Sequence, residues 1–386
     1  MRVYLDHSAT TPLAPEALEA MRPHLETRFG NASSLHAWGR EARAALEDAR
    51  AAMARAVGAP DPQALVFVSG GTEADNLAVK GAARARARRG GHLVVSAIEH
   101  HAVLEAAAAL EAEGFAVTQV PPDDRGRVDP DAIEAALRAE TILAAVMLVN
   151  NETGAVQPLQ EIAARCRARG VLVHGDCVQA LGKIPVDVGA LGVDLAAFSG
   201  HKVYGPKGIG ALYVRPGTPM EALMHGGFQE RSRRGGTEHV AGAVGFARAV
   251  QVTLDALAED APRLTRLREC LEAGILAAVP GVRVNAGAAP RAPHITNLAF
   301  EGVTAESLLI ALDLEGVAAS AGAACSSGSL EPSHVLRAMG LGPERCASSV
   351  RFSLGRGTTT AEVDCTVGAV TRAVERLRAV VPAVAG

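Results

Sequence analysis

The amino-acid sequence predicts an α/β protein with a mostly parallel central sheet covered by helices, followed by a smaller α+β domain. Several short segments are continuously apolar, as is typical of strands that are buried on both faces of a sheet. Amphipathic segments with helical spacing lie between several of these strands, and this alternation is the pattern of parallel α/β folds. After about residue 255 the alternation stops, which indicates a second domain.

The elements of the large domain follow in order along the chain. Residues 41–58 (EARAALEDARAAMARAVG) carry apolar residues at helical spacing, and a glycine closes the segment. The segment 64–71 (ALVFVSGG) predicts a buried strand that runs into a glycine turn, and the helical 72–83 (TEADNLAVKGAA) follows it. Further strands are expected at 93–98, 142–149, 171–176, 195–199 and 209–214, with helix-like segments such as 158–170 between several of them.

The chain beyond residue 255 predicts a smaller α+β domain. It contains a long helical region, strand-like segments at 282–287, 295–302 and 348–355, and helices at 304–315 and at the end. We therefore expect residues 16–255 to form the large domain and residues 256–386 the small one. Residues 1–15 are expected to form an N-terminal segment that packs near the small domain.

Composition narrows the class of protein. Of the 386 residues 48% are hydrophobic but only 3% aromatic, so the core must consist mostly of Ala, Val and Leu. The net charge of −4 argues against a nucleic-acid binder, and the basic run Arg84–Arg89 is interpreted as a solvated helix face. The six cysteines form no CxxC pair, which fits neither a zinc site nor a disulfide framework. With no signal peptide or membrane anchor expected, the sequence predicts a cytoplasmic protein without a membrane partner.

Polar residues gather where the predicted strands end. Five such groups follow five strands: Ser69 to Thr72, Glu99 with His100, Asn150 with Asn151, Asp176 with Gln179, and Ser199 to Lys202. In open parallel sheets, ligands bind outside the carboxyl ends of the strands. We therefore expect these groups to meet in one crevice.

Three of these groups indicate a particular chemistry. Lys202 is one of only four lysines, and burial at a strand end would lower its pKa, so that the neutral amine could form a Schiff base. Asp176 could hold a protonated pyridine nitrogen, or it could simply cap a helix. Gly71 and Thr72 open a helix where backbone N–H groups and a hydroxyl could hold a phosphate, although helix caps have the same pattern. Together the three groups predict a pyridoxal phosphate site.

One cysteine lies in an unusual setting. Cys325 stands in AGAACSSGSLEPSH (321–334), among small residues that cannot bury it in a core. Free cysteines are usually buried, whereas a reactive thiolate must reach its target. The sequence therefore predicts a reactive thiol on an accessible loop.

Taken together, these segments resemble the cysteine desulfurases of the class-V aminotransferase family, which have the type I fold of pyridoxal phosphate enzymes. The resemblance runs over nearly the whole chain. The matching segments are YLDHSATTP, FGNASSLH, VFVSGGTEADNLAVKG, IEHHAVL, VNNETGAVQP, HGDCVQALGK, FSGHKVYGPKGIGALYV, RRGGTE, CSSGSLEPSHVLRAMG and SSVRFSLGRGTT.

The resemblance implies roles for the residues that would bind the cofactor. Lys202 would form the Schiff base and later move the Cα proton of the substrate. Asp176 would bind the pyridine nitrogen, Gln179 the ring hydroxyl, and His100 would stack on the ring and shuttle protons. The phosphate would be held by Gly71, Thr72, Ser199, His201 and, from a partner subunit, Thr237.

Other positions would bind and process the substrate. Asn151 would lie near the ring hydroxyl and the substrate, and Arg351 would clamp the substrate carboxylate, since a guanidinium binds a carboxylate with two hydrogen bonds. For Arg351 the alternative is a salt bridge at a strand edge. Cys325 would attack the sulfur of L-cysteine, leaving a persulfide on the enzyme and releasing L-alanine. The small domain would thus carry both the cysteine loop and the carboxylate-binding arginine.

The resemblance also implies partners: a second copy of the chain, and a sulfur-acceptor protein, which could be an iron–sulfur scaffold or a tRNA-thiolation relay. Cys325 could in addition be a metal ligand, shared with the cluster of a bound scaffold. Three positions depart from the family pattern. Cys177 is interpreted as a small buried hydrophobe, His7 stands at a position that varies among relatives, and Phe228 could alter a dimer rim or the docking of a partner.

Two alternatives remain open at the level of the sequence. Another class-V enzyme, an aminotransferase or a selenocysteine lyase, would share Lys202 and Asp176 but would not need Cys325. A non-catalytic thiol protein would use Cys325 only as a ligand or carrier. A dinucleotide enzyme is excluded, because the SGGTE turn lacks the G-x-G-x-x-G spacing.

Overall fold

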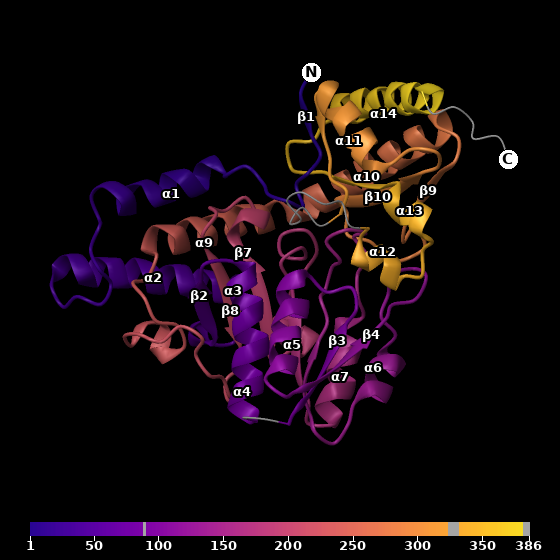
Figure 1. Ribbon diagram of the computed structural model, residues 1–386. Helices are drawn as coiled ribbons and strands as arrows, with labels where there is room; N and C mark the ends of the chain where they lie inside the picture. The colour runs from indigo at the N-terminus through magenta and orange to yellow at the C-terminus, as the bar shows by residue number, and fades with distance from the viewer. Residues whose placement is uncertain (88–89, 323–331, 381–386) are drawn as a thin grey trace.

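The computed structural model describes residues 1–87, 90–322 and 332–380. Figure 1 shows a large sheet flanked by helices, with a second group of helices and short strands gathered near the two termini. This arrangement confirms the predicted α/β class.

The large sheet has seven strands in the order β2-β8-β7-β6-β5-β3-β4. Their bounds are β2 Leu65–Val68, β3 His92–Ser96, β4 Ala116–Val120, β5 Thr141–Ala145, β6 Leu172–Asp176, β7 Leu195–Ser199 and β8 Gly210–Val214. Every pairing is parallel except those of β8, which runs antiparallel to both β7 and β2. Only the short segment 200–209 joins β7 to β8, and a parallel connection needs a longer crossover.

The sequence analysis did not include β4. Its side chains are mostly exposed or half-buried, because β4 is an edge strand that pairs only with β3. It therefore lacks the continuous apolar pattern by which the inner strands are recognised. The predicted strand 142–149 is also shorter than expected, since β5 ends at Ala145.

Helices cover both faces of the large sheet. Alternate residues of β3 point to opposite faces, so that Val94 belongs to one hydrophobic cluster and Leu93 and Val95 to another. On the Val94 side lie residues of α2 Ala37–Ala56, α6 Pro130–Ala136, α7 Leu159–Ala168, α8 Val188–Leu191 and α9 Val240–Asp255. On the other side lie residues of α3 Gly71–Asn76, the π-helical turn η2 Leu77–Gly81, α4 Ala82–Arg86 and α5 His101–Ala112. The core therefore lies in two layers, one on each face of the sheet.

A third hydrophobic cluster lies in the C-terminal part of the chain. Its antiparallel sheet has the order β12-β10-β9 (Ser349–Ser353, Ile295–Phe300 and Val282–Val284), and α10 Leu257–Ala278, α11 Ala305–Leu314 and α14 Thr360–Val380 contribute to the same cluster. The N-terminal β1 Val3–Tyr4 pairs in parallel with β11 Val317–Ala318. Helix α9 ends at Asp255 and α10 begins at Leu257, but the proposed domain boundaries at residues 15 and 255 stay predictions.

Short helices complete the chain. They are α1 Pro15–Glu26, α12 His334–Ala338, α13 Pro343–Ala347 and the 3-10 turns η1 Pro62–Ala64, η3 Gly200–Lys202 and η4 Gln229–Ser232. Within the described ranges, no single helix is long and apolar enough to cross a membrane. Only α9 and α10 taken together reach the length and composition of a membrane span, and they are bent by 72° at their junction.

Candidate functional site

A cavity of about 220 Å3 lies at the carboxyl ends of the parallel strands. It is lined by Ser8, Ala9, Gly71, Thr72, Asp75, His100, Met147, Asn151, Asp176, Val178, Gln179, Ser199, His201, Lys202 and Arg351. The structure thus brings together ten of the residues named from the sequence, which come from all five strand ends and from β12. Their roles are not decided by proximity alone and stay predictions.

The topology explains why these side chains meet. Strands β2, β3, β5, β6 and β7 run in the same direction, so their carboxyl ends lie at one edge of the sheet. The register of β6 and β7 pairs Asp176 with Ala197, which places the end of β7 just beyond Asp176. The turn η3 then carries Lys202 to the cavity wall.

One end of the cavity fits a phosphate. A Cβ atom on Gly71 would lie only 3.0 Å from Val178 Cγ2, so glycine leaves space there that a side chain would fill. The hydroxyl of Ser199 is buried and has no hydrogen-bond partner among the described residues. His201 Nδ1 lies 3.1 Å from Thr10 Oγ1, and burial, followed by the charges of Lys202 and Lys207, lowers the pKa of His201 to about 4. A buried hydroxyl without a partner beside an open glycine turn is a place for an acceptor oxygen from outside the chain.

Asp176 is the acid on the floor of the cavity. Its Oδ1 accepts a hydrogen bond of 2.8 Å from the Val178 N–H. Burial raises the pKa of Asp176, while the Val178 N–H, His174 and Lys202 act in the opposite direction. A cation from outside the chain, such as a protonated pyridine nitrogen, would favour the carboxylate further. The predicted alternative, a helix cap, is not what the structure shows, because Asp176 ends β6 and residues 178–180 form a turn.

His100 combines two roles. Its Nδ1 accepts the Ala102 N–H at 3.1 Å and so caps α5, while its ring also lines the cavity. Burial, with smaller effects of Lys202 and two neighbouring histidines, lowers the pKa of His100 to about 4. The imidazole is therefore neutral at neutral pH, and with Nδ1 accepting a hydrogen bond its proton is assigned to Nε2.

Lys202 is half-buried, less than the sequence predicted. Its Nζ donates hydrogen bonds to the carbonyl oxygens of Ser8 at 2.5 Å and Ala9 at 2.7 Å. The Gln179 side-chain amide also donates to the Ser8 carbonyl, at 2.9 Å. Ser8 and Ala9 of the N-terminal segment thus form part of the cavity wall.

Arg351 both lines the cavity and forms a salt bridge. It is only 2% exposed and lines the cavity, and its Nη2 lies 2.8 Å from Asp6 Oδ1 in an ion pair near the edge strand β12. Its Nη1 donates to the Asn151 carbonyl at 2.9 Å. The Arg351 Nε and the Asn151 Oδ1 have no partner within the part of the chain that the structure describes. The Nε–H of the guanidinium is therefore among the donors that remain for a ligand.

Two predicted site residues are not placed in the cavity. Thr237 is exposed and does not line it, as expected of a residue that would serve a neighbouring subunit. Cys325 lies outside the described residues. The residues that flank its segment both approach Glu152: the Ser333 hydroxyl donates to Glu152 Oε2 at 2.5 Å, and a Cβ on Gly322 would lie 2.7 Å from the same oxygen.

The sequence analysis missed a buried acid in the same wall. Asp75 lines the cavity, and its Oδ1 lies 3.0 Å from Nε2 of the buried His174. Burial, together with the nearby Asp176, raises the pKa of Asp75 well above its ordinary value. Two spacings could have indicated the pair: Asp75 follows Thr72 by three residues on a helix, and His174 precedes Asp176 by two on a strand.

Of the three departures from the family pattern, Cys177 is fully buried in the core, as expected, and burial raises the pKa of its thiol. His7 is also buried, and burial, with a smaller effect of Lys183, lowers its pKa to about 4. Phe228 is 92% exposed.

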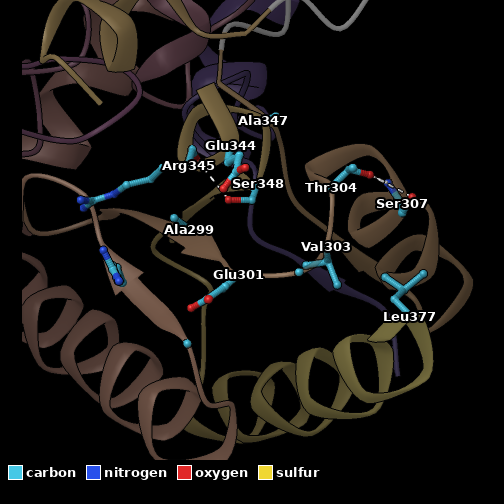
Figure 2. Close-up of a pocket in the computed structure, with 13 residues that line it drawn as sticks. Ala299, Glu301, Val303, Thr304, Ser307, Glu344, Arg345, Ala347, Ser348 and Leu377 are labelled. Atoms are coloured by element: carbon cyan, nitrogen blue, oxygen red, sulfur yellow. Dashed lines mark hydrogen bonds between the residues drawn. The ribbon is translucent and has the colours of Figure 1, made fainter. Parts of the chain in front are cut away.

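A larger cavity of about 700 Å3 lies in the C-terminal part, away from the strand ends. Figure 2 shows Glu344, Arg345 and Ser348 on one wall and Thr304, Ser307 and Leu377 on the opposite side. Among the described residues, the two cavities share no lining residue, and no lining residue of the larger cavity was named from the sequence as a site residue. The chemistry indicated by the sequence therefore belongs to the smaller cavity.

Comparisons with known proteins identify the family of the chain. The family model for Aminotransferase class-V matches residues 3–365. The chain is 46% identical over 380 residues to the cysteine desulfurase IscS of Dictyoglomus turgidum, covering 98% of this chain and 96% of that protein. Among solved structures, a NifS-like protein superposes with a TM-score of 0.91 at 34% identity, covering 97% of this chain and 100% of its own. SspA in complex with cysteine superposes with a TM-score of 0.81 at 34% identity, covering 92% and 99%.

Proposed function

Because the chain belongs to the class-V aminotransferase family, we propose that it is a pyridoxal-phosphate-dependent cysteine desulfurase. It removes the sulfur of L-cysteine, releases L-alanine and carries the sulfur as a persulfide on Cys325. The observation that supports this most is the cavity in which Lys202, Asp176 and Arg351 meet at the strand ends.

The residues present fit the cofactor. The unpartnered Ser199 hydroxyl, the open turn at Gly71 and the hydroxyl of Thr72 would hold its phosphate, with His201 beside them. Asp176, at the other side of the cavity, would hold the pyridine nitrogen. When bound, pyridoxal phosphate supplies an electron-withdrawing ring that stabilises negative charge on the substrate's Cα.

The other cofactor contacts are part of the same proposal. Gln179 would bind the ring hydroxyl, with Asn151 near it and near the substrate, and His100 would stack on the ring. As a neutral imidazole with its proton on Nε2, His100 would donate a hydrogen bond from Nε2–H into the cavity, and it would have to gain a proton before it could release one as an acid.

The substrate would be held and processed by residues of both domains. Arg351 would bind the L-cysteine carboxylate through the N–H that has no partner in the described chain. Lys202 would hold the cofactor by a Schiff base and, as a free amine once the substrate has taken its place, would remove the Cα proton.

Sulfur transfer would then use Cys325. Its thiolate would donate an electron pair to the substrate sulfur, so that an S–S bond forms as the Cβ–S bond breaks. The electron pair of the broken bond would stay with Cβ, which takes up a proton and becomes the methyl group of alanine. A thiol and L-cysteine thus give a persulfide and L-alanine, and no external oxidant is needed.

The persulfide would pass to an acceptor protein, an iron–sulfur scaffold or a tRNA-thiolation relay, in the cytoplasm. Cys325 could at that stage share ligation of the scaffold's cluster. A homodimer is also part of the proposal. Phe29, Leu35 and Phe228 are large apolar side chains that are 72%, 91% and 92% exposed, and a second copy would cover them. Thr237, exposed in the same loop region as Phe228, would then reach the neighbour's phosphate.

The decisive experiment traps the thiols by alkylation after a brief incubation with L-cysteine and measures intact and peptide masses. A sulfur adduct is expected on the peptide that carries Cys325, and it should be absent from Cys325→Ser, which keeps the visible absorbance of the bound cofactor. Cys270→Ser, at an exposed cysteine outside the cavity, is the matched control and should keep the adduct.

Two results would contradict the proposal. Sustained alanine production with persulfide transfer by Cys325→Ser would remove the cysteine from the mechanism. Bound cofactor without any adduct in the unmodified enzyme would favour an aminotransferase or lyase instead.

A further inference from the structure

A second lysine lies behind the cavity and has no role in the reaction described so far. Lys183 lies after β6, a few residues beyond Gln179 in the segment between β6 and α8, and it is only 4% exposed. Its Nζ donates a hydrogen bond of 3.3 Å to the backbone carbonyl of Lys202. The same Nζ lies 4.8 Å from the centroid of the Tyr204 ring, over its face. One buried cation thus contacts the residue that would bear the cofactor and the residue two positions beyond it.

The segment that Lys183 contacts has an unusual backbone. Tyr204 has a φ of 62°, in the left-handed region that bulky side chains rarely adopt. Such a conformation persists only where surrounding contacts impose it. Its N–H donates to Thr11 Oγ1 at 2.8 Å, and its hydroxyl accepts the Arg356 N–H at 2.7 Å. Lys183 is the contact that reaches Tyr204 and the Lys202 carbonyl at once.

We propose that Lys183 is a positioning residue: as a cation, it holds the Lys202 carbonyl and the Tyr204 ring together and keeps the η3 turn in the conformation that places Lys202 in the cavity wall. The attraction between an ammonium and an aromatic face is strongest where water is excluded, as it is here. Lys202 would hold the cofactor and would later act as a base, so its backbone would have to keep the same place for both tasks. This inference rests on the proposed function for the role of Lys202. The contacts of Lys183 with the Lys202 carbonyl and the Tyr204 ring, which we call the brace, are observed in this chain itself.

The charge of Lys183 depends on pH near neutrality. Burial, with a smaller effect of Arg356 and an opposing effect of Asp260, lowers its pKa to about 8. His7 and His294 also face it, and burial holds the pKa values of both well below their ordinary range, so they are neutral at pH 7. Above about pH 8 Lys183 becomes neutral and loses its attraction for the Tyr204 ring. The brace should therefore weaken as the pH rises from 7 to 9.

The same shift gives an opposite prediction for global stability. An ammonium whose pKa is lower in the folded protein than in the unfolded chain makes folding less favourable at every pH below the unfolded value. Lys183→Met removes that cost with a side chain of similar length. The variant should therefore resist urea at pH 7 at least as well as the wild type, while its η3 turn becomes less well held.

Hydrogen–deuterium exchange on the full-length protein tests the proposal, and it can be followed without any turnover. At pH 7, Lys183→Met should exchange the amides within the segment 200–206, of which Pro206 has none, about tenfold faster than the wild type, which corresponds to the loss of one desolvated cation–aromatic contact. Lys183→Arg keeps the cation and should restore most of the protection. Lys207→Met is the matched control, because Lys207 is exposed in the same loop, and it should exchange as the wild type does.

The pH dependence supplies a second arm. After correction for base-catalysed exchange, protection of residues 200–206 should fall between pH 7 and 9 in the wild type and stay constant in Lys183→Met. The proposal would be overturned if residues 200–206 were equally protected in Lys183→Met and Lys207→Met. It would also be overturned if protection in Lys183→Met fell with pH as it does in the wild type. These results do not depend on persulfide formation, so a failure here is distinguishable from a failure of the desulfurase assignment.

Discussion

Replacing Arg351 by lysine tests how the substrate carboxylate is bound. In the structure Nη2 is paired with Asp6 and Nη1 with the Asn151 carbonyl, which leaves Nε as the donor without a partner among the described residues. Lysine keeps the positive charge but presents a single nitrogen in place of a planar fork. It cannot satisfy Asp6, the Asn151 carbonyl and a substrate carboxylate with the same geometry.

The size of the effect follows from one lost charge-assisted hydrogen bond. Such a bond contributes about 1.5–3 kcal/mol, which corresponds to a fall in kcat/KM of about 10- to 150-fold. The loss should appear mainly as a raised KM for L-cysteine, since the guanidinium binds the ground state as well as the transition state. The visible absorbance of the bound cofactor should not change, because Arg351 has no part in holding it.

The assay is alanine formation over a range of L-cysteine concentrations, with the absorbance spectrum recorded before substrate is added. Arg372→Lys is the control, since Arg372 is exposed and pairs with Glu315 at the surface; it should behave as the wild type does. If Arg351→Lys kept kcat/KM within about twofold, Arg351 would be only the edge salt bridge to Asp6. If it lost the cofactor as well, Arg351 would be structural.

Three further predictions concern the cofactor, the buried acids and the dimer. Asp176→Asn removes the carboxylate that would face the pyridine nitrogen, and it should weaken cofactor binding by at least about 30-fold in an absorbance titration of the apoenzyme; an unchanged affinity would exclude that role. Burial, with the nearby Asp176 and Asp75, raises the pKa of Glu99 well above its ordinary value, so the wild type loses stability as the pH rises through that pKa. The free energy of unfolding of Glu99→Gln in urea should therefore rise relative to that of the wild type between pH 5 and 9. For the control Glu111→Gln, at an exposed position, the difference from the wild type should stay constant over this range. A constant difference for Glu99→Gln as well would mean that the Glu99 carboxyl is already ionised. If Thr237 serves the neighbouring subunit, Thr237→Ala should lower activity. Co-expression of Thr237→Ala with the inactive Lys202→Ala should then yield heterodimers that have one intact site and are active. If Thr237 acted within its own chain, both sites of the heterodimer would be defective.

Much of the site could be predicted from local pattern. Asp176 and Ser199 end β6 and β7, Gly71 and Lys202 follow β2 and β7 within three residues, and strands of one direction end at one edge of a sheet. Their meeting in one cavity therefore needed only the correct class of fold. The antiparallel direction of β8 was not evident, because a buried strand has the same composition in either direction.

Other features escaped because nothing in the local sequence marks them. The edge strand β4 is half exposed and lacks an apolar run, and Asp75 has the appearance of an ordinary polar residue in a helix. Its burial follows from the packing of α3 against the ends of β7 and β8, which only the assembled sheet provides.

The sequence by itself determined which residue types stand at each strand end, and with them the family and the cofactor chemistry. Tertiary structure decided what those residues contact. Arg351 pairs with Asp6, 345 positions away, and Lys183 reaches the Lys202 carbonyl across two neighbouring strand ends. Such contacts depend on how the N-terminal segment, the strand ends and β12 come together, and no local periodicity encodes that. The chemistry of the site could therefore be predicted from its motifs, whereas the charges and contacts that hold its lysine and arginine in place are a property of the folded chain.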